Sequence, residues 1–170
     1  MPIYIQTEDF DLSTEVARLR AGKPAIGAIA SFVGVVRDMN DGQDVQAMEL
    51  EHYPGMTEKA LEDIVQQAHQ RWTLQDCLVI HRVGPLQPLD QIVLVAVASA
   101  HRGEAFAACE FIMDYLKTQA PFWKKEQTPQ GARWVDAREG DDRALRKWGL
   151  ASTNSSADPG TTTKNEKDAS

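Results

Sequence analysis

The chain of 170 residues is 42% hydrophobic and 25% charged, which fits one globular domain of ordinary size. Its net charge of -7 argues against general nucleic-acid binding, because that function uses a basic face to neutralise many phosphates. No stretch approaches the roughly 18 apolar residues of a membrane span, and the first residues lack the pattern of a signal peptide, so we expect a cytoplasmic protein.

The chain begins with a predicted strand and a predicted helix. Residues 3–7 form the strand. Ser13 is expected to cap the helix, which buries Val16 and Leu19 and ends at Gly22.

A long apolar segment follows. Residues 25–37 are apolar on both alternating faces until Arg37, which predicts a strand covered on both sides. Residues 38–42 have the composition of a turn, so residues 45–52 are expected to return as the next strand.

The middle of the chain predicts a helix and two strands. Thr57 is expected to cap the helix. Its apolar positions recur at helical spacing: Ala60, Leu61, Ile64, Val65, Ala68 and Trp72. Residues 76–83 form a strand, residues 84–88 a turn, and the almost wholly apolar residues 91–100 a central strand.

A second amphipathic helix spans about residues 103–120 and ends before Pro121. Its apolar positions are Phe106, Cys109, Ile112, Met113, Leu116 and Ala120. Residues 122–127 and 133–137 flank a turn and predict a hairpin, and a short helix over about 141–148 closes the domain.

The order of these elements predicts an α+β fold with mainly antiparallel strand pairing and one domain over residues 1–149. Residues 150–170 are rich in Ser and Thr and have no large apolar side chain. Such a segment cannot bury enough surface to offset its conformational entropy, so a disordered tail is predicted.

The cysteines and histidines do not predict a metal site. Cys77 and Cys109 lie in apolar surroundings without a C-x-x-C spacing, which indicates buried free thiols. The four histidines are scattered, and no H-E-x-x-H spacing occurs. His52 and His81 fall in predicted strands, where structural hydrogen bonds are the expected role.

The segment 114–126 is the strongest candidate for chemistry. Lys117, Lys124 and Lys125 surround a Pro-Phe-Trp step in an otherwise acidic chain. A lysine held against apolar walls loses hydration and can then transfer protons near neutral pH. The alternative is a helix end followed by an amphipathic strand whose lysines extend into solvent.

Other cations lie at the ends of predicted elements. Arg37 ends a strand, where it either enters a pocket or is exposed. His101 and Arg102 begin a helix, whose free amides favour an anion, although a plain connector is an equal alternative. Arg133 and Arg138, near the hairpin, are interpreted as surface charge.

The helix between these groups separates them. At about 1.5 Å per residue, an unbroken helix places His101 more than about 20 Å from Lys117. Either the two ends form separate sites, or a second subunit brings its His101 and Arg102 to the first subunit's lysines. We favour the second alternative, because twofold dimers are common and build shared sites.

Five short blocks of sequence follow one another along the chain. They are FVGVVRD (32–38), LEHYPGM (50–56), HRVG (81–84), SAHR (99–102) and residues 114–126. On these blocks the chain resembles the large, catalytic subunit of molybdopterin synthase over about residues 3–148. Five linked blocks are far more specific than any one short motif.

The resemblance implies an α/β hammerhead-type fold and a homodimer at the centre of a heterotetramer. The partner would be a small ubiquitin-like sulfur carrier whose Gly-Gly tail ends in a thiocarboxylate. The substrate would be cyclic pyranopterin monophosphate and the product molybdopterin, in molybdenum cofactor biosynthesis. Because a thiocarboxylate is itself a nucleophile, the reaction needs no metal, cofactor or protein cysteine.

By position, the resemblance implies that Lys117 and Lys124 are catalytic. It also implies substrate-binding residues, which are Val35, Val36, Arg37, His101, Arg102, Lys125 and Glu126. Further candidates for the pocket are Phe32, Met113 and Arg138.

Two other functions compete with this one. A non-catalytic adaptor would bind the ubiquitin-like tail and use its lysines only as docking charges. A phosphate-ligand sensor would use the helix start at His101 and Arg102 and would need no protein partner.

Overall fold

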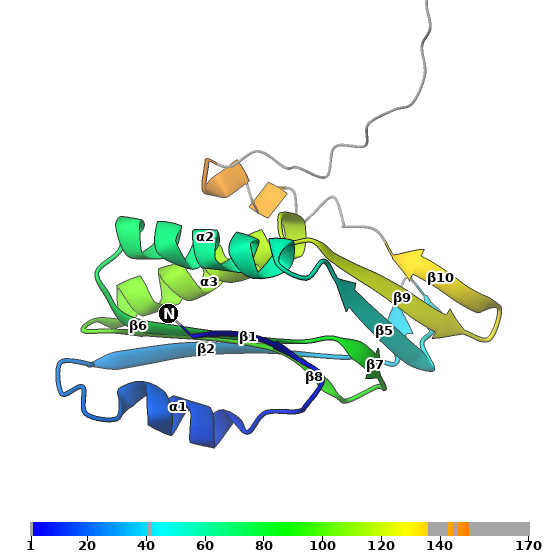
Figure 1. The fold of residues 1–170 in the computed structure, drawn as a ribbon, viewed down its shortest axis with the longest axis horizontal. Helices are drawn as coiled ribbons and strands as arrows, with labels where there is room; N and C mark the ends of the chain where they lie inside the picture. The colour runs from blue at the N-terminus through cyan, green and yellow to red at the C-terminus, as the bar shows by residue number, and fades with distance from the viewer. Residues whose placement is uncertain (1, 41, 136–142, 145, 150–170) are drawn as a thin grey trace, which may run out of the picture.

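A four-stranded sheet forms the main layer of the protein (Figure 1). Its strands lie in the spatial order β1 (Ile3–Gln6), β6 (Leu74–Arg82), β8 (Gln91–Ser99) and β2 (Ala28–Val35). Pairing is antiparallel except between β1 and β6, which run parallel. The computed structural model of the protein describes residues 2–40, 42–135, 143–144 and 146–149.

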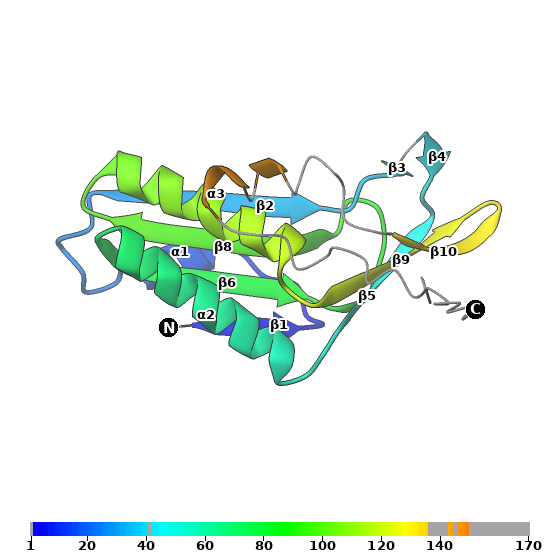
Figure 2. The same cartoon turned by 90° about the horizontal axis from the view of Figure 1, so that it is seen from above.

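Helices cover both faces of this sheet (Figures 1 and 2). Helices α2 (Met56–Arg71) and α3 (Arg102–Thr118) pack on one face, and α1 (Leu12–Arg20) packs on the other. The larger core lies under α2 and α3, where Phe111 meets the sheet; the smaller core lies under α1 and includes Leu19. The side chains of the central strands β6 and β8 therefore alternate between two buried environments.

A second antiparallel sheet extends from one end of the main layer (Figure 2). Its strand order is β10 (Gly131–Val135), β9 (Phe122–Thr128), β5 (Ala47–His52) and β7 (Gly84–Leu86). A small hairpin of β3 (Met39–Asn40) and β4 (Gln43–Asp44) lies between β2 and β5 in the chain.

The predicted α+β class with mainly antiparallel pairing is confirmed. The predicted central strand is β8, which pairs with β6 on one side and β2 on the other. The predicted hairpin near the end of the domain is β9–β10. Cys77 and Cys109 are both buried and free, as expected.

The prediction that residues 45–52 return beside residues 25–37 is wrong. Strand β5 pairs with β9 and β7 in the second sheet instead. The intervening residues form their own β3–β4 hairpin, while the backbone of Val36 bonds to Asp90 and Leu89, so the chain leaves the main sheet. Strand β2 is consequently an edge strand of the main sheet. Its two faces still pack on both cores, through Ala30 and Ile29, but Phe32 near its end is 39% exposed.

Two predicted helix caps also need correction. Asp11, not Ser13, caps α1, because its carboxylate accepts the Thr14 N–H at 2.7 Å. Gly55 precedes α2, whereas Thr57 is buried inside it and joins Tyr53 N–H to the Pro121 carbonyl.

Two further corrections concern one residue and one short segment. Phe106 is 65% exposed, on the outer face of α3. The predicted turn over residues 84–88 contains strand β7, which pairs with β5.

The last described residues pack on the paired helices. The Trp148 ring contacts Trp72 and Phe111, and its indole N–H donates to Asp114 at 2.6 Å. Residues 136–142 and the predicted tail at 150–170 lie outside the described residues, so the domain boundary at 149 stays a prediction. None of the described helices is long and apolar enough to cross a membrane.

Gly27 packs closely against the connection between β8 and α3. Its N–H donates to the Ser99 carbonyl at 3.0 Å, and a methyl group on its Cα would collide with the carbonyl oxygen of Ala100. Only glycine allows this approach, and Ala100 immediately precedes His101.

We therefore expect Gly27→Ala to destabilise the fold by about 1–3 kcal/mol, since the backbone must shift to admit the methyl group. Gly103→Ala is the matched control: a methyl group added there meets nothing within 4 Å, and the residue is helical, so the change should be neutral or stabilise by up to about 1 kcal/mol. Urea unfolding would measure both, and equal effects would contradict the close-approach argument.

Candidate active site

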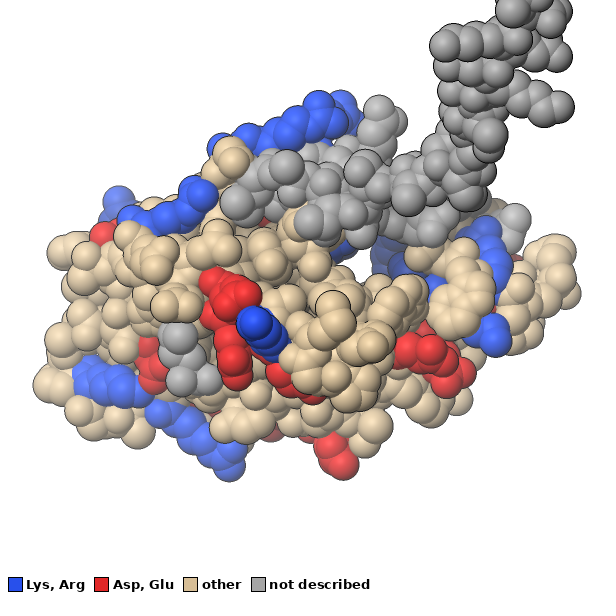
Figure 3. All heavy atoms as spheres, turned by 45° about the horizontal axis from the view of Figure 1, so that its top comes forward, with Lys and Arg blue, Asp and Glu red and all other residues tan. Residues whose placement is uncertain are grey.

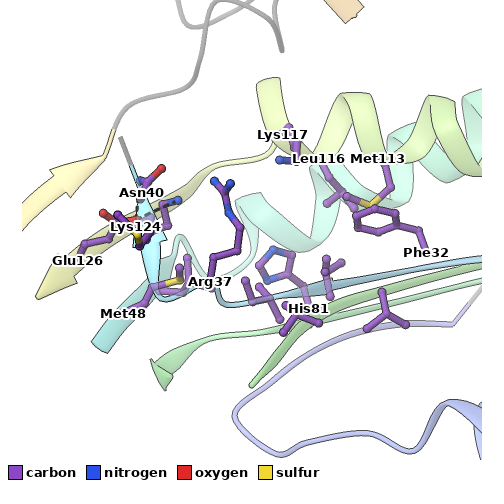
Figure 4. Close-up of a pocket in the computed structure, with 17 residues that line it drawn as sticks. Phe32, Arg37, Asn40, Met48, His81, Met113, Leu116, Lys117, Lys124 and Glu126 are labelled. Carbon is purple, nitrogen blue, oxygen red and sulfur yellow. Dashed lines mark hydrogen bonds and ion pairs between the residues drawn. The ribbon is translucent and has the colours of Figure 1, made fainter. Parts of the chain in front are cut away.

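A cavity of about 340 Å³ lies where the C-terminal end of α3 faces the second sheet (Figure 4). Its wall includes the end of β2, the β3 segment, β5, β9 and the end of β6. The charged and polar side chains that line it are Arg37, Asn40, His81, Lys117, Lys124 and Glu126.

The two candidate catalytic lysines reach this cavity from consecutive elements. Lys117 lies in the last turn of α3, and Lys124 is the third residue of β9. The helix stops at Thr118 because Pro121 cannot continue it, and the chain then turns into β9. The break between the elements thus lets both ammonium groups face one space, although Lys117 is exposed and Lys124 is half-buried.

Glu126 is the anchor of the site. Its carboxylate is 1% exposed and accepts hydrogen bonds from Asn40 at 2.7 Å and from the Arg133 guanidinium at 3.1 Å. The Lys124 Nζ lies 3.5 Å from Glu126 Oε1, the same carboxylate oxygen that accepts from Asn40. A buried carboxylate needs such partners, because an unpaired buried charge is strongly destabilising.

The wall of the cavity carries a net positive charge. It has three cations, Arg37, Lys117 and Lys124, against the single carboxylate of Glu126. In the space-filling view, Lys and Arg atoms border the hollow beside the β9–β10 hairpin (Figure 3). In a protein of net charge -7, this local excess favours a small anionic ligand.

Apolar side chains complete the wall. Phe32 and Val35 contribute from β2, and Met113 contributes from α3. Val36 does not line the cavity: its side chain is 1% exposed and packs with Met48 and Leu86 in a separate core cluster. Because successive side chains of an extended chain point to opposite sides, Val36 points away from the cavity that Val35 lines.

Lys125 also lies away from this cavity. It alternates with Lys124 along β9, and its ammonium lies over the Trp134 ring at 5.6 Å from the centroid. Within the single chain, the structure therefore brings Lys124 and Glu126 together but places Lys125 on the other face of the sheet.

His101 and Arg102 are at the opposite end of α3, where both side chains are exposed. The 17 residues of α3 span about 25 Å, so these two groups cannot reach the cavity of their own chain. Arg138 lies outside the described residues.

Sequence reasoning missed two residues of this region. Arg133 was expected as surface charge, but its side chain is half-buried and binds Glu126. The signal was present, because a turn after Thr128 pairs Glu126 with Arg133 directly across the hairpin. His81 was expected only as a structural residue, but it also lines the cavity.

The pKa of His81 is lowered to about 4, chiefly by burial and to a smaller extent by the nearby His52, against a hydrogen bond to the Arg82 carbonyl that raises it. The imidazole is therefore neutral at pH 7. In the described part of the chain, no group of three or more His, Cys, Asp or Glu side chains is suited to hold a metal.

Comparison with known proteins adds an independent finding. The family model described as MoaE protein matches residues 5–119, a range that contains Arg37, His101, Arg102 and Lys117 but ends before Lys124. The molybdopterin synthase catalytic subunit of Ralstonia nicotianae is 72% identical over 155 residues, which cover 91% of this chain and 88% of that protein.

Solved structures agree with this match. The molybdopterin biosynthesis MoaE protein from Burkholderia ambifaria has a TM-score of 0.76 and 65% identity, covering 88% of this chain and 98% of that one. The molybdopterin synthase from Staphylococcus aureus has a TM-score of 0.73 and 32% identity, covering 78% of this chain and 96% of that one.

The neutral His81 predicts acid sensitivity. Its pKa is lower in the folded chain than in the unfolded chain, so the unfolded chain binds the extra proton first as the pH falls. Stability should be unaffected above about pH 6.5 and should fall by about 3 kcal/mol as the pH drops to about 4. Urea unfolding at several pH values would measure this, and His81→Gln should lack that part of the loss. A parallel loss in the variant would assign the effect to other groups.

Proposed function

Because the chain belongs to the MoaE family, which includes molybdopterin synthase catalytic subunits, we propose that it is an enzyme that transfers sulfur to cyclic pyranopterin monophosphate. The sulfur comes from the C-terminal thiocarboxylate of a small ubiquitin-like partner, and the product is the dithiolene of molybdopterin. The observation that carries this proposal is the cavity in which Lys117 and Lys124 converge on a net positive wall.

The charges of the cavity fit both reactants. The thiocarboxylate and the cyclic phosphate are anions, and Arg37 with the two lysines supplies the opposite charge. As the cyclic phosphate opens, its leaving oxygen gains negative charge that an ammonium can stabilise and then protonate. Each transferred sulfur leaves the carrier once water cleaves the carrier's acyl–sulfur bond, which regenerates a carboxylate. Two sulfurs therefore require two thiocarboxylate equivalents.

Glu126 contributes by placing Lys124 rather than by touching the substrate. Its carboxylate is shared among Asn40, Arg133 and Lys124, and it is 1% exposed. Met113, Phe32 and Val35 supply apolar contacts for the pterin ring or for the narrow Gly-Gly tail.

A second copy of the chain completes the site in this proposal. The length of α3 keeps His101 and Arg102 away from their own cavity, yet both are exposed at a helix N-terminus that suits a phosphate. A twofold dimer that brings this end to the partner's cavity supplies the missing phosphate contacts. The Ralstonia nicotianae relative is a catalytic subunit, so that protein is itself part of a larger assembly.

We expect Lys117→Ala and Lys124→Ala each to lower the sulfur-transfer rate by about 10²–10⁴-fold, because each removes a cation that stabilises charge or moves a proton. Lys147→Ala is the matched control, since Lys147 is an exposed lysine that pairs with Glu110 in the middle of α3 and does not line the cavity, and it should leave the rate unchanged. The assay incubates the purified protein with thiocarboxylated carrier and the cyclic pterin, then quantifies dithiolene product.

The same assay tests the function itself. A wild-type protein that binds the carrier but forms no dithiolene would be an adaptor. Near-normal turnover in both lysine variants would contradict the assignment of the catalytic residues.

Mixed dimers test the shared site. A His101→Ala chain and a Lys117→Ala chain are each expected to be impaired alone, whereas a dimer of one copy of each should contain one intact site of its two. Tandem affinity tags on the two chains would isolate this dimer, which should show about half of the wild-type rate. Activity no higher than that of the separate variants would place both residues in one chain's site or in unrelated sites.

A further inference from the structure

His81 lies near the end of β6, where the side chains that cover the main sheet change. Cys77 and Val79 precede it on the same face of β6 and are covered by α2 and α3. At His81 the helical cover ends, and the ring instead stacks on Phe122 from β9, with 3.8 Å between ring centroids and 15° between planes. Figure 4 shows the imidazole projecting into the space between Arg37 and the side chains of α3.

The surroundings of His81 fix which ring nitrogen carries the proton. The Nδ1 atom lies 2.8 Å from the Arg82 carbonyl oxygen, which can only accept a hydrogen bond. The neutral imidazole must therefore carry its hydrogen on Nδ1, and Nε2 keeps a lone pair. Burial keeps the ring in this neutral form at pH 7 by lowering its pKa to about 4.

The Nε2 atom has no hydrogen-bond partner within the described part of the chain. Over those same residues, His69 Nε2 is the one side-chain nitrogen or oxygen that is fully buried without a partner. His81 Nε2 also lacks a partner, but it is not fully buried, so solvent reaches it. The space from which solvent reaches it is the cavity, because this ring lines that cavity.

This acceptor contrasts with the other polar groups of the wall. Arg37, Lys117 and Lys124 are donors, Asn40 donates its amide N–H to Glu126, and the carboxylate of Glu126 accepts from both Asn40 and Arg133. A ligand held only by donors would leave its own N–H groups unpaired on binding, which costs affinity.

We propose that His81 is a positioning residue whose Nε2 accepts a hydrogen bond from an N–H donor of a reactant in the cavity. This inference rests on the proposed function. Both reactants carry such donors, namely the ring and amino N–H groups of the pterin and the backbone N–H groups of the Gly-Gly tail. The stack on Phe122 and the bond to Arg82 hold the ring in the orientation that this contact requires.

A pair of substitutions separates the two ring nitrogens. His81→Asn places an amide near Nδ1 and can keep the bond to the Arg82 carbonyl, but it removes the acceptor at the Nε2 position. His81→Gln reaches the Nε2 position with an amide oxygen and restores that acceptor. We expect about a 10-fold lower kcat/KM for His81→Asn and less than a 3-fold change for His81→Gln, with similar melting temperatures.

A purely structural role for His81 predicts the reverse order, because the bond to Arg82 then matters most. Equal losses in the two variants, or a larger loss in His81→Gln, would overturn the proposal. Wild-type protein that forms no dithiolene would instead refute the proposed function, which keeps the two failures distinct.

Nitrogen NMR of histidine-labelled wild-type protein provides a readout that does not depend on turnover. The free protein should show a protonated Nδ1 and an unprotonated Nε2. Addition of cyclic pyranopterin monophosphate alone, or of thiocarboxylated carrier alone, should move the Nε2 resonance in the arm that supplies the donor. A protonated Nε2 in the free protein, or an unchanged resonance in both arms, would overturn the proposal.

Discussion

The site depends on one buried carboxylate. Glu126 lies on the inner face of β9 and is nearly sealed from water. It joins the distant β3 hairpin through Asn40, the adjacent strand β10 through Arg133 and its own strand through Lys124. Taking a charge out of water is costly, so the fold must hold these partners in place. The same constraint that orders the second sheet also fixes the direction of the Lys124 ammonium.

The cavity lies at a seam between the two sheets, not within either of them. The main sheet ends near Val35 and His81, α3 ends near Lys117, and β9 begins immediately afterwards. One turn at Pro121 thereby brings a helix end, a strand start and an edge strand to the same space. The length of α3, however, places His101 and Arg102 at its far end, so these two groups cannot contribute to the cavity of their own chain.

Much of this arrangement follows from local patterns in the sequence. The apolar run that became β8, the helical spacing of Leu61, Ile64 and Val65, and the turn before Gly131 each identified an element correctly. The partner of β5 could not be predicted, because strand alternation specifies which face is buried but not which strand lies alongside.

Non-local contacts also explain what sequence reasoning missed in the site. The role of His81 depends on Phe122, which is 41 positions later and stacks on it only because the second sheet folds back. The pairing of Arg133 with Glu126, in contrast, is local and follows from the hairpin register.

The two cysteines do not take part in the chemistry of the site. Burial raises the pKa of Cys77 to about 12 and that of Cys109 to about 11, so neither forms appreciable thiolate at neutral pH. In the proposed reaction the carrier's acyl group therefore meets no competing thiolate from these two residues. It does not pass to the enzyme as a dead-end thioester with loss of the sulfur as hydrosulfide.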